Sequence, residues 1–129
     1  MQISWLVDKR VIFVDIGTTL TMVDLIEMND NIIELLNTGE PEVHIIYRAT
    51  EIKSFPMTFS SVGDVFTMVG HKNLGWSITI SNSRILRLIG TMVNKIANRH
   101  TIKYLDSYDD AKQLLKKQDP TLPDLPDSL

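Results

Sequence analysis

Short β-branched runs alternate along this chain with segments of helical periodicity, and this alternation constrains the fold more than any other feature. The first two runs adjoin at Asp8-Lys9 and predict a β-hairpin. Strands are expected at residues 3–7, 9–14, 43–47, 76–80 and 100–105, and helices at residues 22–36, 59–69, 84–98 and after Ser107, which is expected to cap the last helix. A strand–helix–strand unit is normally parallel and right-handed. The order ββαβαβαβα therefore predicts an α/β fold with a mixed, mostly parallel sheet.

The first predicted helix carries start and stop signals. Thr21 and Asp24 have the spacing of a capping box, and the sequence Gly39-Glu40-Pro41 ends the helical pattern. The apolar residues of this helix are expected to share one stripe: Met22, Leu25, Ile26, Ile32, Ile33 and Leu36.

Composition places the chain among soluble globular proteins. It has 129 residues, 43% hydrophobic and 22% charged, and the absence of cysteine excludes disulfides, thiolate metal ligands and cysteine nucleophiles. The first residues lack the features of a signal peptide, and no apolar run approaches the roughly 20 residues of a membrane span. We expect a cytoplasmic protein with one domain over residues 1–117. Residues 118–129 are expected to form a Pro-rich acidic tail, extended or disordered.

Charge is unevenly distributed. The net charge is −3, and the isoelectric point of about 5.5 argues against nucleic-acid binding. No acidic residue lies between Asp64 and Asp106, whereas this stretch contains several lysines and arginines. Such a distribution is able to steer an anionic ligand or an acidic partner, and a solvated helix face is the alternative explanation.

Three short stretches accompany the element order: Gly75-Trp76, Ser81-Asn82-Ser83-Arg84 and Asp119-Pro120-Thr121-Leu122-Pro123. With them, residues 1–117 resemble the SpoIIAA-like, STAS-type domain of anti-sigma-factor antagonists. The likeness is to small stand-alone bacterial proteins of that superfamily that have no assigned activity. The resemblance implies a non-enzymatic domain whose partner is another protein.

Regulatory STAS domains have an Asp-Ser-Ser-Gly-type sequence at the start of the second helix, and a kinase phosphorylates a serine in it. The corresponding residues 54–63 lack the aspartate. By this resemblance the candidate switch residues are Thr58, Ser60 and Ser61, since a phosphate at a helix N-terminus meets free N–H groups. Helix capping is the alternative role for each of these hydroxyls.

A candidate anion or ligand site lies at Ser81, Asn82, Ser83 and Arg84. These residues follow a predicted strand and open a helix, the position at which open α/β sheets bind ligands. Hydroxyls, free N–H groups and a guanidinium suit a phosphate or carboxylate, whereas capping alone also explains the two serines.

Several methionines add soft apolar surface that suits either core filling or an apolar-ligand pocket: Met22, Met28, Met57, Met68 and Met92.

No residue pattern indicates catalysis. The run Asp15-Ile16-Gly17-Thr18-Thr19 resembles the first phosphate loop of sugar kinases and actin-like ATPases, but 129 residues leave no room for their second lobe. His44, His71 and His100 lack the spacing of a helical metal site, and no nucleophile elbow or phosphate-binding P-loop is present. We therefore expect no enzyme activity, no metal and no cofactor.

These observations favour a regulatory or protein-interaction module of STAS-like type that self-associates, with a homodimer as the expected assembly. The alternative is a carrier of a small apolar ligand or lipid, held between sheet and helices.

Overall fold

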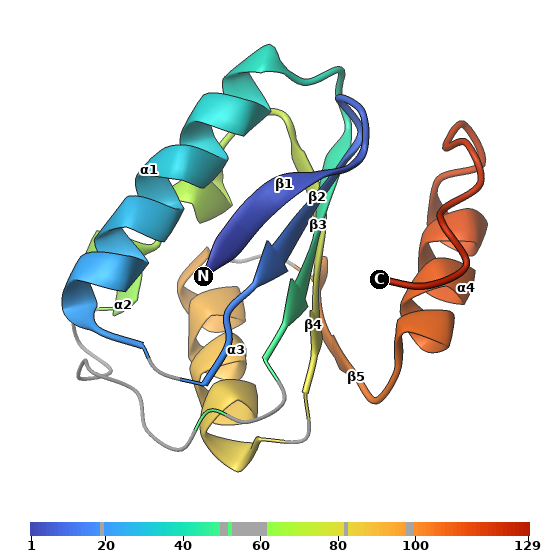
Figure 1. Ribbon diagram of the computed structural model, residues 1–129. Coiled ribbons are helices and arrows are strands. Elements are labelled where there is room, and N and C mark those ends of the chain that lie inside the picture. The colour runs from blue at the N-terminus through green and yellow to red at the C-terminus, as the bar shows by residue number, and fades with distance from the viewer. Residues whose placement is uncertain (19, 50–51, 53–61, 82, 98–99) are drawn as a thin grey trace.

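A five-stranded sheet runs through the protein in the order β1-β2-β3-β4-β5, as the computed structural model shows (Figure 1). The structure describes residues 1–18, 20–49, 52, 62–81, 83–97 and 100–129. β1 and β2 are antiparallel, and all other neighbours are parallel, which confirms the predicted α/β class with a mixed sheet. The strands are β1 (Gln2–Val7), β2 (Val11–Asp15), β3 (Val43–Arg48), β4 (Leu74–Ile80) and β5 (Ile102–Leu105).

The helices cover the two faces of the sheet unequally. One face, here called the helical face, lies against α1 (Met22–Thr38), α2 (Val62–Val65), the 3-10 turn η2 (Thr67–Gly70) and α3 (Arg84–Ala97) (Figure 1). The other, here called the tail face, lies against α4 (Tyr108–Gln118) and residues 119–129. Sequential parallel strands with right-handed crossovers place their connecting helices on the same side of a sheet. That rule explains why only the last helix lies on the tail face.

The predicted elements differ from the observed ones mainly around the second helix. A single helix was expected over residues 59–69, but the described part contains two short pieces, α2 and η2, separated by Phe66. The first helix extends two residues further than predicted, to Thr38.

The capping signals of α1 are confirmed. The Thr21 hydroxyl accepts from the Asp24 N–H at 3.1 Å, and the Asp24 carboxylate accepts from the Thr21 N–H at 3.0 Å. After the helix, the Gly39 N–H bonds to the Leu36 carbonyl.

The predicted apolar stripe of α1 is confirmed at Leu25, Ile32 and Leu36 but was wrong in part. Ile26 is 48% exposed, whereas Met28 and Asn29 are buried beside Leu25. Asn29 is buried because its amide fixes η2: it donates to the Thr67 hydroxyl at 2.9 Å and accepts from the Met68 N–H at 3.0 Å. Periodicity alone does not reveal such a polar residue, because its partners lie on a distant element.

The central strand β3 is buried on both faces. Val43 and Ile45 contribute to the core under α1, and Ile46 contributes to the core under α4. This double burial explains why β3 reads as a continuous apolar run. Among the described residues, no helix has both the length and the apolar character needed to cross a membrane.

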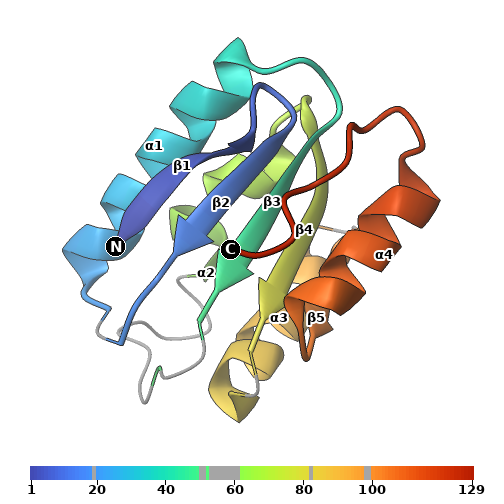
Figure 2. The same ribbon diagram turned by 45° about the vertical axis from the view of Figure 1, so that its right-hand side comes forward.

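The C-terminal residues lie across the tail face. Gln118 is the last residue of α4, and residues 119–129, called the tail from here on, contain no helix or strand and turn back over the sheet (Figure 2). The expected cap of α4 is confirmed, because the Ser107 hydroxyl accepts from the Asp110 N–H at 3.2 Å. Leu122, Leu125 and Leu129 are partly buried in the same apolar cluster as Val11 and Ile46.

Candidate functional site

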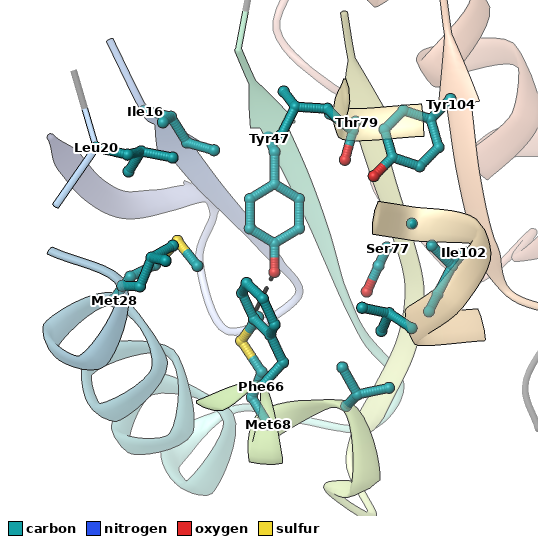
Figure 3. Close-up of a pocket in the computed structure, with 15 residues that line it drawn as sticks. Ile16, Leu20, Met28, Tyr47, Phe66, Met68, Ser77, Thr79, Ile102 and Tyr104 are labelled. Atoms are coloured by element: carbon teal, nitrogen blue, oxygen red, sulfur yellow. Dashed lines mark hydrogen bonds between the residues drawn. The ribbon is translucent and has the colours of Figure 1, made fainter. Parts of the chain in front are cut away.

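An apolar cavity of about 90 Å³ lies between the helical face and its covering helices (Figure 3). Its outer wall comes from three helical segments and the residue before one of them: Leu25 and Met28 on α1, Phe66, Met68 and Val69 at η2, and Leu86 and Val93 on α3. The inner wall comes from β3, β4 and β5.

Tyr47, on β3, projects into the cavity with its hydroxyl toward η2 (Figure 3). This hydroxyl donates to the Met68 sulfur at 3.7 Å, and the side chain is buried. Burial raises the pKa of Tyr47, so the phenol stays protonated at neutral pH. A thioether is a weak acceptor, so the hydroxyl retains most of its capacity to bind a stronger one.

Tyr104 lines the opposite side of the cavity, on β5. Its hydroxyl interacts with the Thr79 side chain and with the backbone at Gly90, and burial raises the pKa of Tyr104 to about 12. A Cβ at Gly90 would overlap the Tyr104 ring. The contact between α3 and β5 therefore requires glycine at this position.

The lining is electrically neutral. None of the described residues that line the cavity is acidic, basic or histidine. Its polar groups are the hydroxyls of four residues on the sheet: Tyr47, Ser77, Thr79 and Tyr104. One wall therefore offers hydrogen bonds and the other only apolar contact, an arrangement typical of small-molecule sites.

The predicted anion site has both serine oxygens engaged within its own loop. Ser81 is 2% exposed, and its hydroxyl accepts from the Ser83 N–H at 3.0 Å. The Ser83 hydroxyl accepts from the Leu86 N–H at 3.4 Å, and Arg84 is exposed. Asn82 lies outside the described residues. The alternative role of capping accounts for the geometry of Ser83, whereas Ser81 makes a turn bond two residues along the loop before α3.

The predicted switch residues Thr58, Ser60 and Ser61 lie outside the described residues, as does Met57. Of the other methionines suggested as pocket lining, Met28 and Met68 line the cavity.

Asp15, from the sequence that resembles a phosphate loop, ends β2 in an ion pair. Its carboxylate accepts from the Arg48 guanidinium at 2.7 Å, and this hydrogen bond lowers the pKa of Asp15. Arg48 also lies over the Phe13 ring, 5.2 Å from its centroid. Within the described part of the chain, no group of three or more potential ligands is arranged to hold a metal ion.

His44 is fully buried on the tail face, and both ring nitrogens are engaged. Nδ1 accepts from the Trp76 N–H at 2.9 Å, so the neutral ring carries its proton on Nε2 and donates it to Asp119, 2.8 Å away. Burial lowers the pKa of His44, although the hydrogen bond and charge of Asp119 act in the opposite direction. An imidazole with both nitrogens occupied has no lone pair for a substrate, so His44 serves structure.

Sequence reasoning missed the hydroxyls of the cavity and the partner of His44. A signal for the hydroxyls was present, because Ser77 and Thr79 alternate with Ile78 and Ile80 on a strand buried between helices. No local signal points from His44 to Asp119, since 75 residues separate them.

Comparison of the chain with protein-family models, with curated proteins and with solved structures finds no match.

Proposed function

We propose that this protein is a non-enzymatic binding module that holds a small, neutral, largely apolar ligand in the cavity of the helical face. One observation carries the proposal: the buried Tyr47 hydroxyl points into a neutral cavity, where its hydrogen-bond acceptor is the sulfur of Met68. A ligand oxygen would replace that weak acceptor. The apolar helical wall would bury the rest of the ligand.

The cavity limits the size of the ligand. An engineered apolar cavity of about 150 Å³ binds benzene, and the cavity of 90 Å³ is smaller. The proposed ligand is therefore a short alkyl group that bears one hydrogen-bond acceptor, such as a small ketone, ester or alcohol. A charged ligand would leave its ion unpaired among apolar groups.

Native mass spectrometry of freshly purified protein, followed by thermal shifts with short ketones and alcohols, tests this proposal. We expect Tyr47→Phe to weaken the stabilisation by acceptor-bearing compounds while sparing that by hydrocarbons of equal size. Val93→Phe fills the cavity and should abolish both responses. Leu114→Phe, on α4 at the other face, is the matched control and should preserve them. Absence of any ligand response in the unmodified chain contradicts the proposal.

We also propose, as a second candidate, a regulatory or protein-interaction module of STAS-like fold. The element order and the sequential strand order support this proposal. Val23 and Ile26 lie one helical turn apart on α1 and are 62% and 48% exposed, which favours a second copy of the chain docking there. Light scattering should then show a mass above the monomer that Ile26→Glu abolishes. A monomer at tens of micromolar removes the proposed self-association.

A further inference from the structure

The tail contacts a defined part of the tail face, here called the tail-binding surface: Arg10, Val11, His44, Ile46, Tyr108 and Lys112. Val11 and Ile46 belong to the apolar cluster against which the tail leucines pack, α4 borders the surface on one side, and Arg10 and His44 lie at the end that holds Asp119. Figure 2 shows the tail passing over the strands beside α4.

Two groups of the surface hold one carboxylate. Arg10 and His44 both donate to the same Asp119 oxygen, each at 2.8 Å. The Arg10 guanidinium also donates to the Thr121 hydroxyl at 3.1 Å. Burial raises the pKa of Asp119, but hydrogen bonds from Thr121 and His44 outweigh it and hold the pKa below its usual value. The ionised carboxylate is therefore the form that this end recognises.

The side of the surface formed by α4 binds backbone carbonyls. The Tyr108 hydroxyl donates to the Pro126 carbonyl at 2.6 Å, and the Lys112 ammonium donates to the Asp127 carbonyl at 3.4 Å. In all of these contacts the surface donates and the tail accepts. Proline has a carbonyl but no N–H, so a proline-rich segment suits a surface of donors.

The side chains of the tail have the matching spacing. Leu122 and Leu125 are three residues apart, each followed by Pro-Asp. A polyproline II segment has three residues per turn, which would place both leucines on one side, and both pack in the cluster that contains Val11 and Ile46. The tail carries three aspartates and no basic residue, complementary to Arg10 and Lys112.

We propose that the tail-binding surface is a docking site for an acidic, proline-rich segment with leucines three residues apart, and that its occupant in trans is the tail of a second copy. In the monomer the chain's own tail fills the site. Asp119 caps the C-terminus of α4, where its N–H donates to the Leu115 carbonyl at 2.8 Å. The exchanged part is therefore residues 120–129, whose leucines and carbonyls make the same contacts in the second copy. This surface is separate from the cavity, so the inference stands or falls independently of the proposed ligand.

A synthetic peptide with the sequence of residues 119–129, carrying a fluorescent label, tests the site on the full-length chain. Leu125→Asp in the chain should release the chain's own tail and thereby lower the dissociation constant of the peptide about tenfold. This factor corresponds to the free energy of burying about half of a leucine side chain. Ser128→Asp adds the same charge at an exposed position of the tail and is the matched control, with binding as in the unmodified chain. A peptide with Leu122→Asp and Leu125→Asp should not bind.

A mixing experiment tests the second copy as the occupant. Arg10→Glu repels Asp119 and leaves an intact but released tail, whereas Leu125→Asp leaves an intact surface. Native mass spectrometry should show each variant alone as a monomer and the mixture of the two as a heterodimer. As the control, a mixture of Arg10→Glu with Ser128→Asp should give no heterodimer. Circular dichroism checks that each variant is folded, and the peptide experiment does not depend on Arg10→Glu.

Equal peptide affinity of the Leu125→Asp and Ser128→Asp chains overturns the docking site. Peptide binding without a heterodimer overturns the second copy as occupant and assigns the surface to a similar segment of another protein. Loss of the heterodimer on adding Ile26→Glu would also contradict the proposal, because that residue lies on α1 at the opposite face.

Discussion

The two faces of the sheet are covered by different means. On the helical face α1, α2, η2 and α3 provide regular elements, and a cavity remains beneath them (Figure 3). On the tail face a single helix and an irregular segment cover the strands, and Leu122, Leu125 and Leu129 pack there together with Leu115. The face with more regular structure is thus the one that contains the cavity.

The difference follows from how each cover adapts to the sheet. A helix presents side chains at fixed angles, so short helices at an interruption leave volume that their side chains do not reach. An irregular segment adjusts its backbone residue by residue, but it makes few backbone hydrogen bonds of its own. The tail therefore depends on a small number of contacts, above all those of Asp119.

The largest expected difference between the faces concerns matched leucine truncations. Leu115 lies on α4 and its side chain is fully buried, so Leu115→Ala should destabilise the protein by about 4 kcal/mol. Leu25→Ala, equally buried but beside the cavity, should cost about 2 kcal/mol, because a side chain next to a void has fewer contacts to lose. Urea unfolding measures both, and equal costs would contradict the contrast between the faces.

Gly90→Ala tests the contact of α3 with Tyr104. An alanine in a helix normally stabilises by up to about 1 kcal/mol, but here its Cβ overlaps the Tyr104 ring, so we expect a loss of about 2 kcal/mol. Gly70→Ala is the control, since no atom lies within 4 Å of its added Cβ. Stabilisation by Gly90→Ala in thermal unfolding would refute the contact.

Asp119→Ala tests the attachment of the tail. It leaves the buried Nε2–H of His44 without its acceptor and removes the ion pair of Arg10, so we expect a loss of about 1–2 kcal/mol. Amide hydrogen exchange should increase in β2 and β3, under the tail. Unchanged exchange in those strands would show that Asp119 does not hold the tail in place.

The stability of the tail face should depend on pH. The pKa of His44 lies below its ordinary value of 6.5, with Asp119, Glu42 and Arg10 as the charges that act on it. Below about pH 6.5 the unfolded chain binds a proton that the folded chain does not, so stability falls as the pH falls. The pKa of Asp119 is also lowered, so its contribution is present above pH 3.8 and is lost further into acid. His44→Gln should flatten the dependence between pH 7 and 5 in urea titrations.

The smallest effect on stability is expected at an exposed ion pair that lies neither at the cavity of the helical face nor in the tail-binding surface. Arg87 and Asp106 lie 3.3 Å apart with side chains 53% and 81% exposed, so Asp106→Asn should change stability by less than about 0.5 kcal/mol. Comparison with Asp119→Ala in the same unfolding assay separates a buried attachment from a solvated pair. A larger loss for Asp106→Asn than for Asp119→Ala would reverse this ranking.

The sequence by itself determined the strands, the helices α1, α3 and α4, the mixed sheet and the caps. Strand and helix periodicity, Thr21 with Asp24, and Ser107 act within one or two turns of chain, so their signals are local. Periodicity failed where a distant partner decided the outcome, as it did for Asn29 on α1, which is bonded to Thr67 and Met68.

Only the tertiary structure decided the two candidate sites. The cavity arises from the way α1, η2 and α3 meet over the sheet, and no single segment encodes that volume. The contact of Asp119 with Arg10 and His44 joins residues 109 and 75 positions apart. Such contacts depend on how the elements pack, and a local pattern carries no information about which distant group will fill the remaining space.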